Sequence, residues 1–321
     1  MTVRANRASV SAPPPSLLVF AGIISVQLGA GLAGRMFSEL GPAGVTALRL
    51  GWAAIIMAII GGRGAAAAVR AAITDHAWRD LIVAVAFGLV LGVMNFSIYQ
   101  AFARIPLGVA VTIEFLGPLA VAVASSRRLL DLAWVIMAAA GVLLLTKNDA
   151  AVPAGSAGSH TSGPLAGLST HATGIAFALI AATSWAAYIL LTRATGRRFS
   201  GSSGLVIAMI VAAVLVAAPA AVTTGAAVFR PPVVAEGLAI GLLSSVIPYR
   251  LELEALRRVP AGIFGIWMSL EPVVAALVGI VLLSETLVLR QWLAIGLVVV
   301  ACAGASRGVQ QNRQQLPPTG G

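Results

Sequence analysis

The stretch Ile105-Pro106-Leu107-Gly108-Val109-Ala110-Val111-Thr112-Ile113-Glu114 begins the apolar run that decides the fold of this chain. The run extends from Ile105 to Val123 and contains one charged residue, Glu114, near its middle. A helix of this length matches the hydrocarbon layer of a bilayer, which is roughly 30 Å thick. The sequence therefore predicts a membrane-spanning helix with an acid close to the bilayer centre.

A second stretch repeats the same pattern in the other half of the chain. Four positions of the stretch Ala101-Phe102-Ala103-Arg104-Ile105-Pro106-Leu107-Gly108 recur in Ala255-Leu256-Arg257-Arg258-Val259-Pro260-Ala261-Gly262. They are the first alanine, the arginine before the Ile or Val, the proline and the final glycine. Pro118 and Pro272 follow at the same distance in the two copies, and the second copy has its own central acid, Glu271. Two related helices with central carboxylates predict a transporter built from a duplicated unit.

The composition indicates an integral membrane protein. The chain has 321 residues, of which 59% are hydrophobic and 10% charged, and its mean hydropathy is +0.96. Soluble domains contain roughly 25% charged residues. The net charge of +10 does not indicate a nucleic-acid-binding protein, because the basic residues lie in short gaps between apolar runs. The single cysteine, Cys302, allows no internal disulfide, and the histidines lack metal-ligand spacing, so we expect neither a metal nor another cofactor.

Ten apolar runs predict ten membrane-spanning helices. The first follows the basic residues Arg4 and Arg7, and we interpret it as a retained helix rather than a signal peptide because further spans follow it. The predicted spans are residues 17–36, 43–61, 81–100, 105–123, 129–146, 173–192, 204–223, 234–250, 259–283 and 287–305.

The basic residues in the gaps predict the orientation of these helices. Fifteen Lys and Arg residues fall in the gaps on one side of the membrane and five in the gaps on the other, with Arg49 left out because it lies inside a span. Basic residues are enriched on the cytoplasmic side of membrane proteins. Both termini are therefore predicted to be cytoplasmic.

The longest gap, residues 147–172, divides the chain into two sets of five spans. It is rich in Ala, Gly, Ser, Thr and Pro, and we interpret it as a flexible linker on the outer side. Because five is odd, the two sets enter the membrane in opposite senses, which predicts an all-α fold of two inverted-topology repeats with a site at the midplane between them. The predicted divisions are a cytoplasmic tail (1–16), a first repeat (17–146), the linker, a second repeat (173–305) and a second cytoplasmic tail (306–321).

Prolines predict a bend in each central helix. Proline has no N–H and its ring displaces the carbonyl four residues before it. Pro118 is therefore expected to free the carbonyl of Glu114, and Pro272 that of Met268. Free carbonyls at this depth need protein or a water-filled cavity beside them. The alternative is that the bends only shape the bundle.

Glu114 is the predicted centre of the site. A carboxylate near the middle of the bilayer costs roughly 2.5–3.5 kcal/mol on insertion scales, so it needs a partner or a cavity. Desolvation favours its neutral form, and Glu114 can then take up a proton near neutral pH. It would pair with a substrate ammonium, carry the coupling proton, or do each in turn. The alternative is a static ion pair with Arg49.

The two other acids near these helices are predicted to be structural or solvated. Glu271 aligns with Gly117 rather than with Glu114, and its position before Pro272 suits a bond to neighbouring backbone that fixes the bend. Glu285 ends its helix near the outer surface, where water would solvate it.

Polar and aromatic side chains on several spans are compatible with a small binding pocket. Such groups also bond across helices as packing contacts, so each one has a structural alternative. Besides Glu114, the candidate substrate-binding residues are Gln27, Asn95, Tyr99, Trp185, Tyr188, Tyr249, Trp267 and Ser269.

Seven short motifs carry a family resemblance. They are Gly44 to Leu50, Pro106 to Val111 with Glu114-Phe115, Gly117 to Ala122, Ser125 to Arg128, Ser184 to Leu190, Phe264-Gly265 with Met268 to Pro272, and Glu285-Thr286-Leu287. With them the chain resembles the bacterial threonine/homoserine exporters, in the ten-helix EamA branch of the drug/metabolite transporter superfamily. The chain departs from that pattern at Gly34-Arg35, where a lysine is expected, and in the more charged stretch Arg250 to Glu254.

The resemblance implies ten helices, an inverted repeat and proton-driven efflux of small amino acids across the bacterial inner membrane. The expected partners are an amino-acid substrate, protons and the lipid bilayer, with no nucleic acid, and a homodimer is compatible with this class. An exporter of other metabolites or drugs on the same scaffold is the nearest alternative. A passive channel and a membrane-embedded enzyme are further alternatives, and the lack of histidine in every predicted span disfavours the enzyme.

Overall fold

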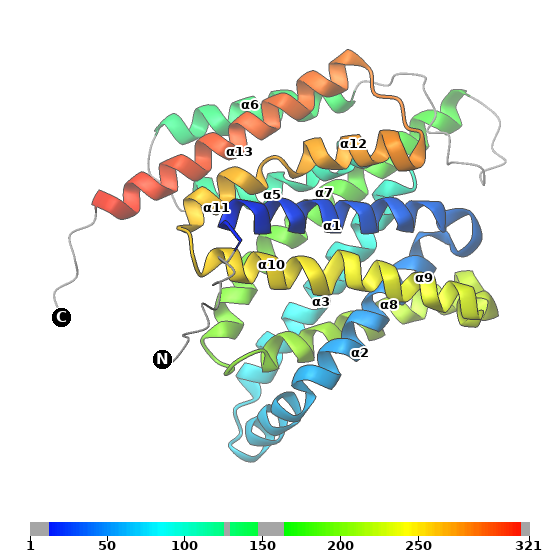
Figure 1. Cartoon of the computed structure of the whole chain (residues 1–321), viewed down its shortest axis with the longest axis vertical. Coiled ribbons are helices and arrows are strands. Elements are labelled where there is room, and N and C mark those ends of the chain that lie inside the picture. Colours follow the sequence, from blue (N-terminus) through cyan, green and yellow to red (C-terminus); the bar gives the residue numbers. More distant parts are fainter. Residues whose placement is uncertain (1–12, 125–128, 147–163, 316–321) are drawn as a thin grey trace, which may run out of the picture.

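The described part of the chain is a bundle of helices (Figure 1). The computed structural model describes residues 13–124, 129–146 and 164–315. In these ranges nine helical segments are long and apolar enough to cross a membrane, and a tenth helix has a shorter apolar part, Leu132–Leu145. The prediction of an all-helical, multi-pass membrane protein is therefore confirmed.

Each predicted span falls on one helix or on two or three consecutive helical segments. In chain order these are α1 (Pro15–Arg35), α2 (Phe37–Thr74), α3 (Trp78–Phe102), α4 (Leu107–Glu114), α5 (Leu116–Ala124), α6 (Leu129–Thr146), α7 (Pro164–Gly196), α8 (Ser203–Thr224), η1 (Gly225–Phe229), α9 (Pro231–Gly241), η2 (Leu242–Val246), α10 (Ile247–Leu256), α11 (Ala261–Met268), α12 (Glu271–Leu283) and α13 (Leu289–Gln315).

Three helices extend well beyond the predicted spans, and one of them is α13, which continues past residue 305 into the expected C-terminal tail and ends at Gln315. α2 continues past residue 61 to Thr74 because the chain there is rich in alanine, a strong helix former. α7 begins at Pro164, so residues 164–172 of the expected linker are helical. Residues 147–163 and the motif at residues 125–128 lie outside the described part of the chain.

The two central spans are interrupted at corresponding points of the repeated sequence. One consists of α4 and α5, with a break at Phe115, and the other of α11 and α12, with a break at Ser269 and Leu270. Pro118 and Pro272 lie in the first turns after these breaks, so the predicted bends are confirmed.

The turns that lead into these spans also match. Pro106 (φ −53°, ψ 142°) and Pro260 (φ −58°, ψ 143°) directly precede α4 and α11 with the same extended backbone. In one turn the N–H of Ile105 donates to the carbonyl of Ala101 at 2.9 Å, and in the other Val259 donates to Ala255 at 3.1 Å. The repeated sequence therefore produces the same local structure twice.

Helices from the two halves of the chain pack against each other. α1 contacts α10 and α12, α2 contacts α8, and α3 contacts α7 and α8, while α13 covers α6 (Figure 1). α1 begins and α13 ends on the same side of the bundle, at the left of Figure 1. Because the halves are interleaved, the space between them lies inside the bundle rather than at its surface.

Small residues allow the broken helices to approach their neighbours closely. A Cβ atom added at Gly117 in α5 would collide with the carbonyl oxygen of Ala182 in α7, and one at Gly108 in α4 would lie 2.6 Å from Cα of Ala276 in α12. Contacts this close are typical of small-residue helix interfaces in membranes. The position of α4 and α5 therefore depends on these two glycines.

We predict that Gly117→Ala destabilises the protein by about 1–3 kcal/mol, because the methyl group must displace the backbone of α7. The measurement is thermal unfolding in detergent. Gly296→Ala in α13 is the matched control, since nothing lies within 4 Å of its added Cβ and alanine favours the helix. Equal unfolding temperatures for the two variants would contradict the close packing of α5 on α7.

Candidate functional site

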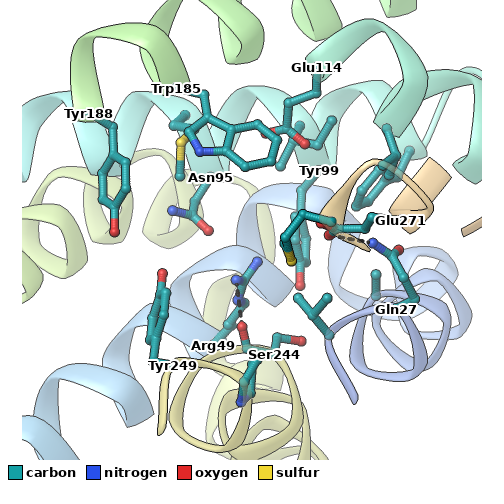
Figure 2. Close-up of a pocket in the computed structure, with 18 of the residues that line it drawn as sticks. Gln27, Arg49, Asn95, Tyr99, Glu114, Trp185, Tyr188, Ser244, Tyr249 and Glu271 are labelled. Carbon is teal, nitrogen blue, oxygen red and sulfur yellow. Dashed lines mark hydrogen bonds between the residues drawn. The ribbon is translucent and has the colours of Figure 1, made fainter. Parts of the chain in front are cut away.

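A cavity of about 170 Å³ lies beside the two helix breaks, where helices of both halves meet (Figure 2). Seven of the nine candidate substrate-binding residues line it, together with Arg49 and Glu271. The seven are Gln27, Asn95, Tyr99, Glu114, Trp185, Tyr188 and Tyr249. The cavity thus combines four aromatic side chains with a phenol or indole group, two amides and several charges, a mixture that suits a small polar ligand.

The other two candidates do not line the cavity. Ser269 lies in the break before α12, and its hydroxyl donates to the carbonyl of Ile266 at 2.6 Å. Trp267 packs instead into an apolar cluster with Leu18 and Ile23 of α1. Pro118 and Pro272 are also outside the lining and act on the site only through the bends.

Glu114 is the last residue of α4 and faces the cavity. Its side chain is half-buried, and within the described residues it has no hydrogen bond and no ion pair. Arg49 acts on it electrostatically but lies across the cavity in Figure 2. The alternative of a static Glu114–Arg49 ion pair is therefore not observed.

Arg49 is held by a π-helical segment and by an aromatic ring. Its Nη2 donates to the carbonyl of Ser244 at 3.0 Å, and its Nε donates to Oγ of Ser245 at 3.4 Å. Its Cζ lies 5.3 Å from the ring centroid of Tyr99, a distance typical of a cation–π contact. Both serines belong to η2, a π-helix, and such segments are frequent at functional sites. None of these partners is an anion, so the charge of Arg49 remains available to the cavity.

Glu271 is placed differently from the prediction. Instead of bonding neighbouring backbone, its Oε1 accepts a hydrogen bond from Nε2 of Gln27 in α1 at 2.9 Å. The break at Ser269 and Leu270 turns the first residue of α12 toward the inside of the bundle, which the sequence spacing alone does not show. Glu271 is buried, with 8% of its surface exposed.

Glu252 is a cavity residue that the sequence analysis did not select. It lies on α10 on the same face as Ser244, Pro248 and Tyr249, which also line the cavity. The spacing of four residues from Ser244 to Pro248 and from Pro248 to Glu252 is a helical-face signal that could have identified it. The unusually charged stretch Arg250 to Glu254 therefore contributes one carboxylate to the site.

Glu285 is buried rather than solvated, which corrects the prediction. Only 8% of its surface is exposed, and its two carboxylate oxygens accept hydrogen bonds from the N–H of Leu107 at 3.0 and 3.1 Å. The chain reverses after α12 through Ser284, which has a left-handed backbone (φ 55°), and this brings Glu285 to the start of α4. Glu285 therefore caps the helix that carries Glu114 at its other end.

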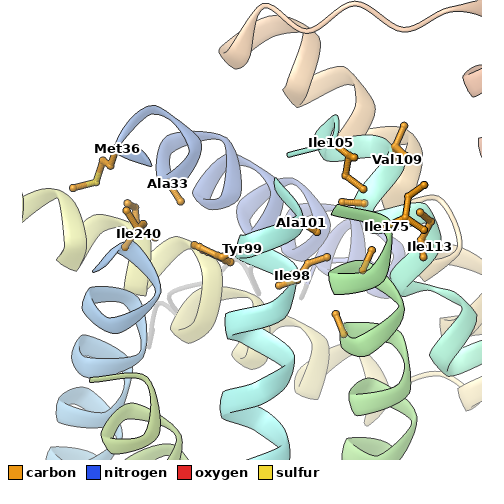
Figure 3. Close-up of a cluster of buried hydrophobic side chains, with 14 of the residues drawn as sticks. Ala33, Met36, Ile98, Tyr99, Ala101, Ile105, Val109, Ile113, Ile175 and Ile240 are labelled. Carbon is orange, nitrogen blue, oxygen red and sulfur yellow. The ribbon is translucent and has the colours of Figure 1, made fainter. Parts of the chain in front are cut away.

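A buried apolar cluster adjoins the cavity next to Tyr99 (Figure 3). It includes Ala33 and Met36 at the end of α1 and Ile240 of α9, and each of these is nearly inaccessible to solvent. Tyr99 belongs both to this cluster and to the cavity lining. Dry packing therefore separates the cavity from the turn between α1 and α2.

A cavity lined by charged, amide and aromatic side chains inside a membrane-spanning bundle, beside two broken helices, is typical of a membrane transport protein rather than a soluble enzyme. Comparison with known proteins agrees. Residues 172–307 match the EamA-like transporter family. The threonine/homoserine exporter RhtA of Escherichia coli (strain K12) is 35% identical over 298 residues, which cover 93% of each chain.

The same exporter of Salmonella typhimurium (strain LT2) is 35% identical over 300 residues, 94% of each chain. A crystal structure with 18% sequence identity aligns with a TM-score of 0.50 over 94% of this chain and 99% of the other, which supports the fold alone. The chain therefore belongs to the EamA-like transporter family, and the family resemblance found in its motifs is confirmed.

The buried cap on α4 makes stability depend on pH. Burial raises the pKa of Glu285 from 4.5 to about 7, and the bond from Leu107 opposes part of this rise. Between these values the folded protein holds a proton that the unfolded chain has lost, so stability falls as the pH rises from about 4.5 to about 7. We predict that Glu285→Gln, which keeps an acceptor for Leu107 and cannot ionise, reduces this fall.

The measurement is the unfolding temperature in detergent at intervals from pH 5 to pH 8 for wild type and Glu285→Gln. The same substitution at Glu236, an exposed residue of α9, tests whether loss of any carboxylate has this effect. Parallel pH profiles for wild type and Glu285→Gln would show that Glu285 does not titrate in this range.

Proposed function

We propose that this protein exports small amino acids of the threonine/homoserine type from the cytoplasm, in exchange for protons. The observation that carries the proposal is the composition of the cavity. Its lining includes three carboxylates, Glu114, Glu252 and Glu271, and an arginine, Arg49, that has no anionic partner among the described residues. An amino-acid zwitterion has an ammonium group that can pair with a carboxylate and a carboxylate group that can pair with the arginine. The relatives named as threonine/homoserine exporters support the choice of amino acids.

The size of the cavity favours a small solute over a drug. Drug-sized ligands occupy pockets of roughly 300–1,000 Å³, whereas this cavity measures about 170 Å³. An exporter of other metabolites remains the second candidate, because several small polar molecules would fit the same space.

We further propose that the two halves of the chain are inverted-topology repeats and that the cavity opens alternately to each side. The matching turns before α4 and α11, and the breaks at corresponding positions, support a common origin of the halves. Sites of such transporters lie at the midplane between repeats, beside broken helices. The distribution of basic residues supports placing both termini in the cytoplasm, in a bacterial inner membrane.

In this mechanism Glu114 carries the coupling proton. Its lack of a hydrogen bond or ion pair within the described residues leaves the carboxylate free to change its protonation state without breaking a contact. Proton binding from outside would remove its negative charge from the cavity and weaken the hold on a cationic group. Release of the proton to the cytoplasm would restore that charge for the next substrate molecule.

We predict that Glu114→Gln reduces the amino-acid uptake that a pH gradient drives into inverted membrane vesicles. The expected reduction is about tenfold or more, because glutamine cannot carry a proton. Exchange of labelled for unlabelled substrate without a gradient should persist. Glu236→Gln, outside the cavity, is the control and should behave as wild type. Gradient-driven uptake at the wild-type rate in Glu114→Gln would remove this residue from the mechanism.

We also predict that expression of the protein protects a sensitive strain against inhibitory concentrations of threonine and homoserine and not against acidic amino acids, because the carboxylates of the cavity repel a second negative charge. Growth on a panel of amino acids, analogues and drugs is the measurement. Protection against drugs alone would favour the second class of exporter.

A further inference from the structure

Within the described part of the chain, most of the buried side-chain polar atoms that lack a hydrogen-bond partner lie at the cavity, and they differ in their chemistry. Four such side-chain atoms belong to cavity-lining residues: Oε1 of Gln27, Oε2 of Glu271, the hydroxyl of Tyr99 and Oγ of Ser244. Oε1 of Gln27 accepts hydrogen bonds and cannot donate them, and the same is true of Oε2 of an ionised Glu271. The two hydroxyls can both accept and donate. A buried polar group without a partner is costly, so these atoms indicate what the cavity is built to bind.

The two acceptors belong to one hydrogen-bonded pair. Nε2 of Gln27 donates to Oε1 of Glu271 at 2.9 Å, which orients both side chains and leaves one oxygen of each unpartnered (Figure 2). Gln27 is 3% exposed and Glu271 is 8% exposed, so neither oxygen can turn outward to bulk water. Two fixed oxygens of this kind suit a group that carries several hydrogens, such as an ammonium.

The two hydroxyls lie beside the positive charge. Arg49 donates to the backbone carbonyl of Ser244 and stacks on the ring of Tyr99. Tyr99 is fully buried and Ser244 is 2% exposed. In Figure 2 Arg49 and Ser244 lie apart from Glu271 and Gln27, so the cavity has a donor-rich part and an acceptor-rich part.

We propose that Gln27 Oε1 and Glu271 Oε2 form the ammonium subsite of this cavity. The inference deepens the proposed function and rests on it: the amino group of the substrate lies at the Gln27–Glu271 pair, and its carboxylate faces Arg49, Tyr99 and Ser244. One zwitterion then satisfies both sets of unpartnered atoms. Glu114 binds no part of the amino acid directly and is left to carry the proton.

Glu271 suits recognition better than the other two carboxylates. A recognition group is held in place by its own neighbours, and Gln27 holds Glu271 in this way. Glu114 has no such hydrogen bond within the described residues, and none involving the Glu252 side chain is found there either.

The test compares two ligands that differ only in the amino group. Homoserine and 4-hydroxybutyrate share the carboxylate, the chain length and the hydroxyl. Binding of each to the purified full-length protein in nanodiscs is measured by isothermal titration calorimetry. We expect wild type to bind homoserine at least about tenfold more tightly, because the analogue leaves both oxygens without a donor.

Glu271→Gln removes the charge and keeps the shape of the side chain. We expect it to weaken homoserine binding by about tenfold or more and to change 4-hydroxybutyrate binding by less than about twofold, so that the advantage of the amine disappears. Gln27→Ala is a second variant with the same expected direction, should Glu271→Gln fold poorly. Glu236→Gln on α9 is the matched control and should keep the full advantage of the amine.

Four results would overturn the proposal. Retention of the amine advantage in both Glu271→Gln and Gln27→Ala would show that the ammonium binds elsewhere, while amino-acid export itself would stand. Loss of the advantage in Glu114→Gln alone would assign the ammonium to Glu114. A sodium requirement that Glu271→Gln removes, with the amine advantage unchanged, would identify an alkali-cation site. If wild type bound neither homoserine nor threonine, the proposed function would fail first, and the subsite with it.

Discussion

The cost of placing polar groups in hydrocarbon governs this structure. A carboxylate or guanidinium near the bilayer centre must have a partner or face a cavity, and an interrupted helix must find partners for its freed backbone groups. The protein places both kinds of expensive feature together. The breaks at Phe115 and at Ser269 to Leu270 lie beside the same cavity that Arg49, Glu114 and Glu271 line. The same cavity therefore accommodates both the charged side chains and the interrupted backbone.

The elements that surround the cavity are closely packed. Gly108 and Gly117 bring α4 and α5 into backbone contact with α12 and α7, and Glu285 holds the start of α4. Arg49 is fixed by η2 and by the ring of Tyr99, whose other neighbours are apolar. The side chains that face the cavity thus project from elements whose positions are set by packing, which is the condition for selective binding.

The sequence was sufficient to locate the membrane helices because the hydrophobic signal is local. Apolar runs of membrane-spanning length located the helices, and Pro118 and Pro272 located both breaks. The aromatic and amide residues of the cavity were also found, since polar groups inside such runs are few. The direction in which a side chain points, however, depends on the tertiary structure and not on the neighbouring sequence alone. The wrong predictions concern side chains of this kind. Glu271 and Glu285 were misplaced because a helix break and a chain reversal turn them inward. Glu252 was missed because a charge near the end of a span looks like a surface residue.

The two copies of the repeated sequence have become chemically unequal. Glu114 is the last residue before one break and Glu271 the first residue after the other, so they occupy different sides of the same structural feature. One carboxylate has no hydrogen bond within the described residues, and the other is tied to Gln27 and almost fully buried. Groups of the same type in different surroundings take different roles, since the surroundings decide whether a carboxylate binds a cation or exchanges a proton. The repeated sequence thus provides two similar helix breaks, whereas the partners of the two acids differ.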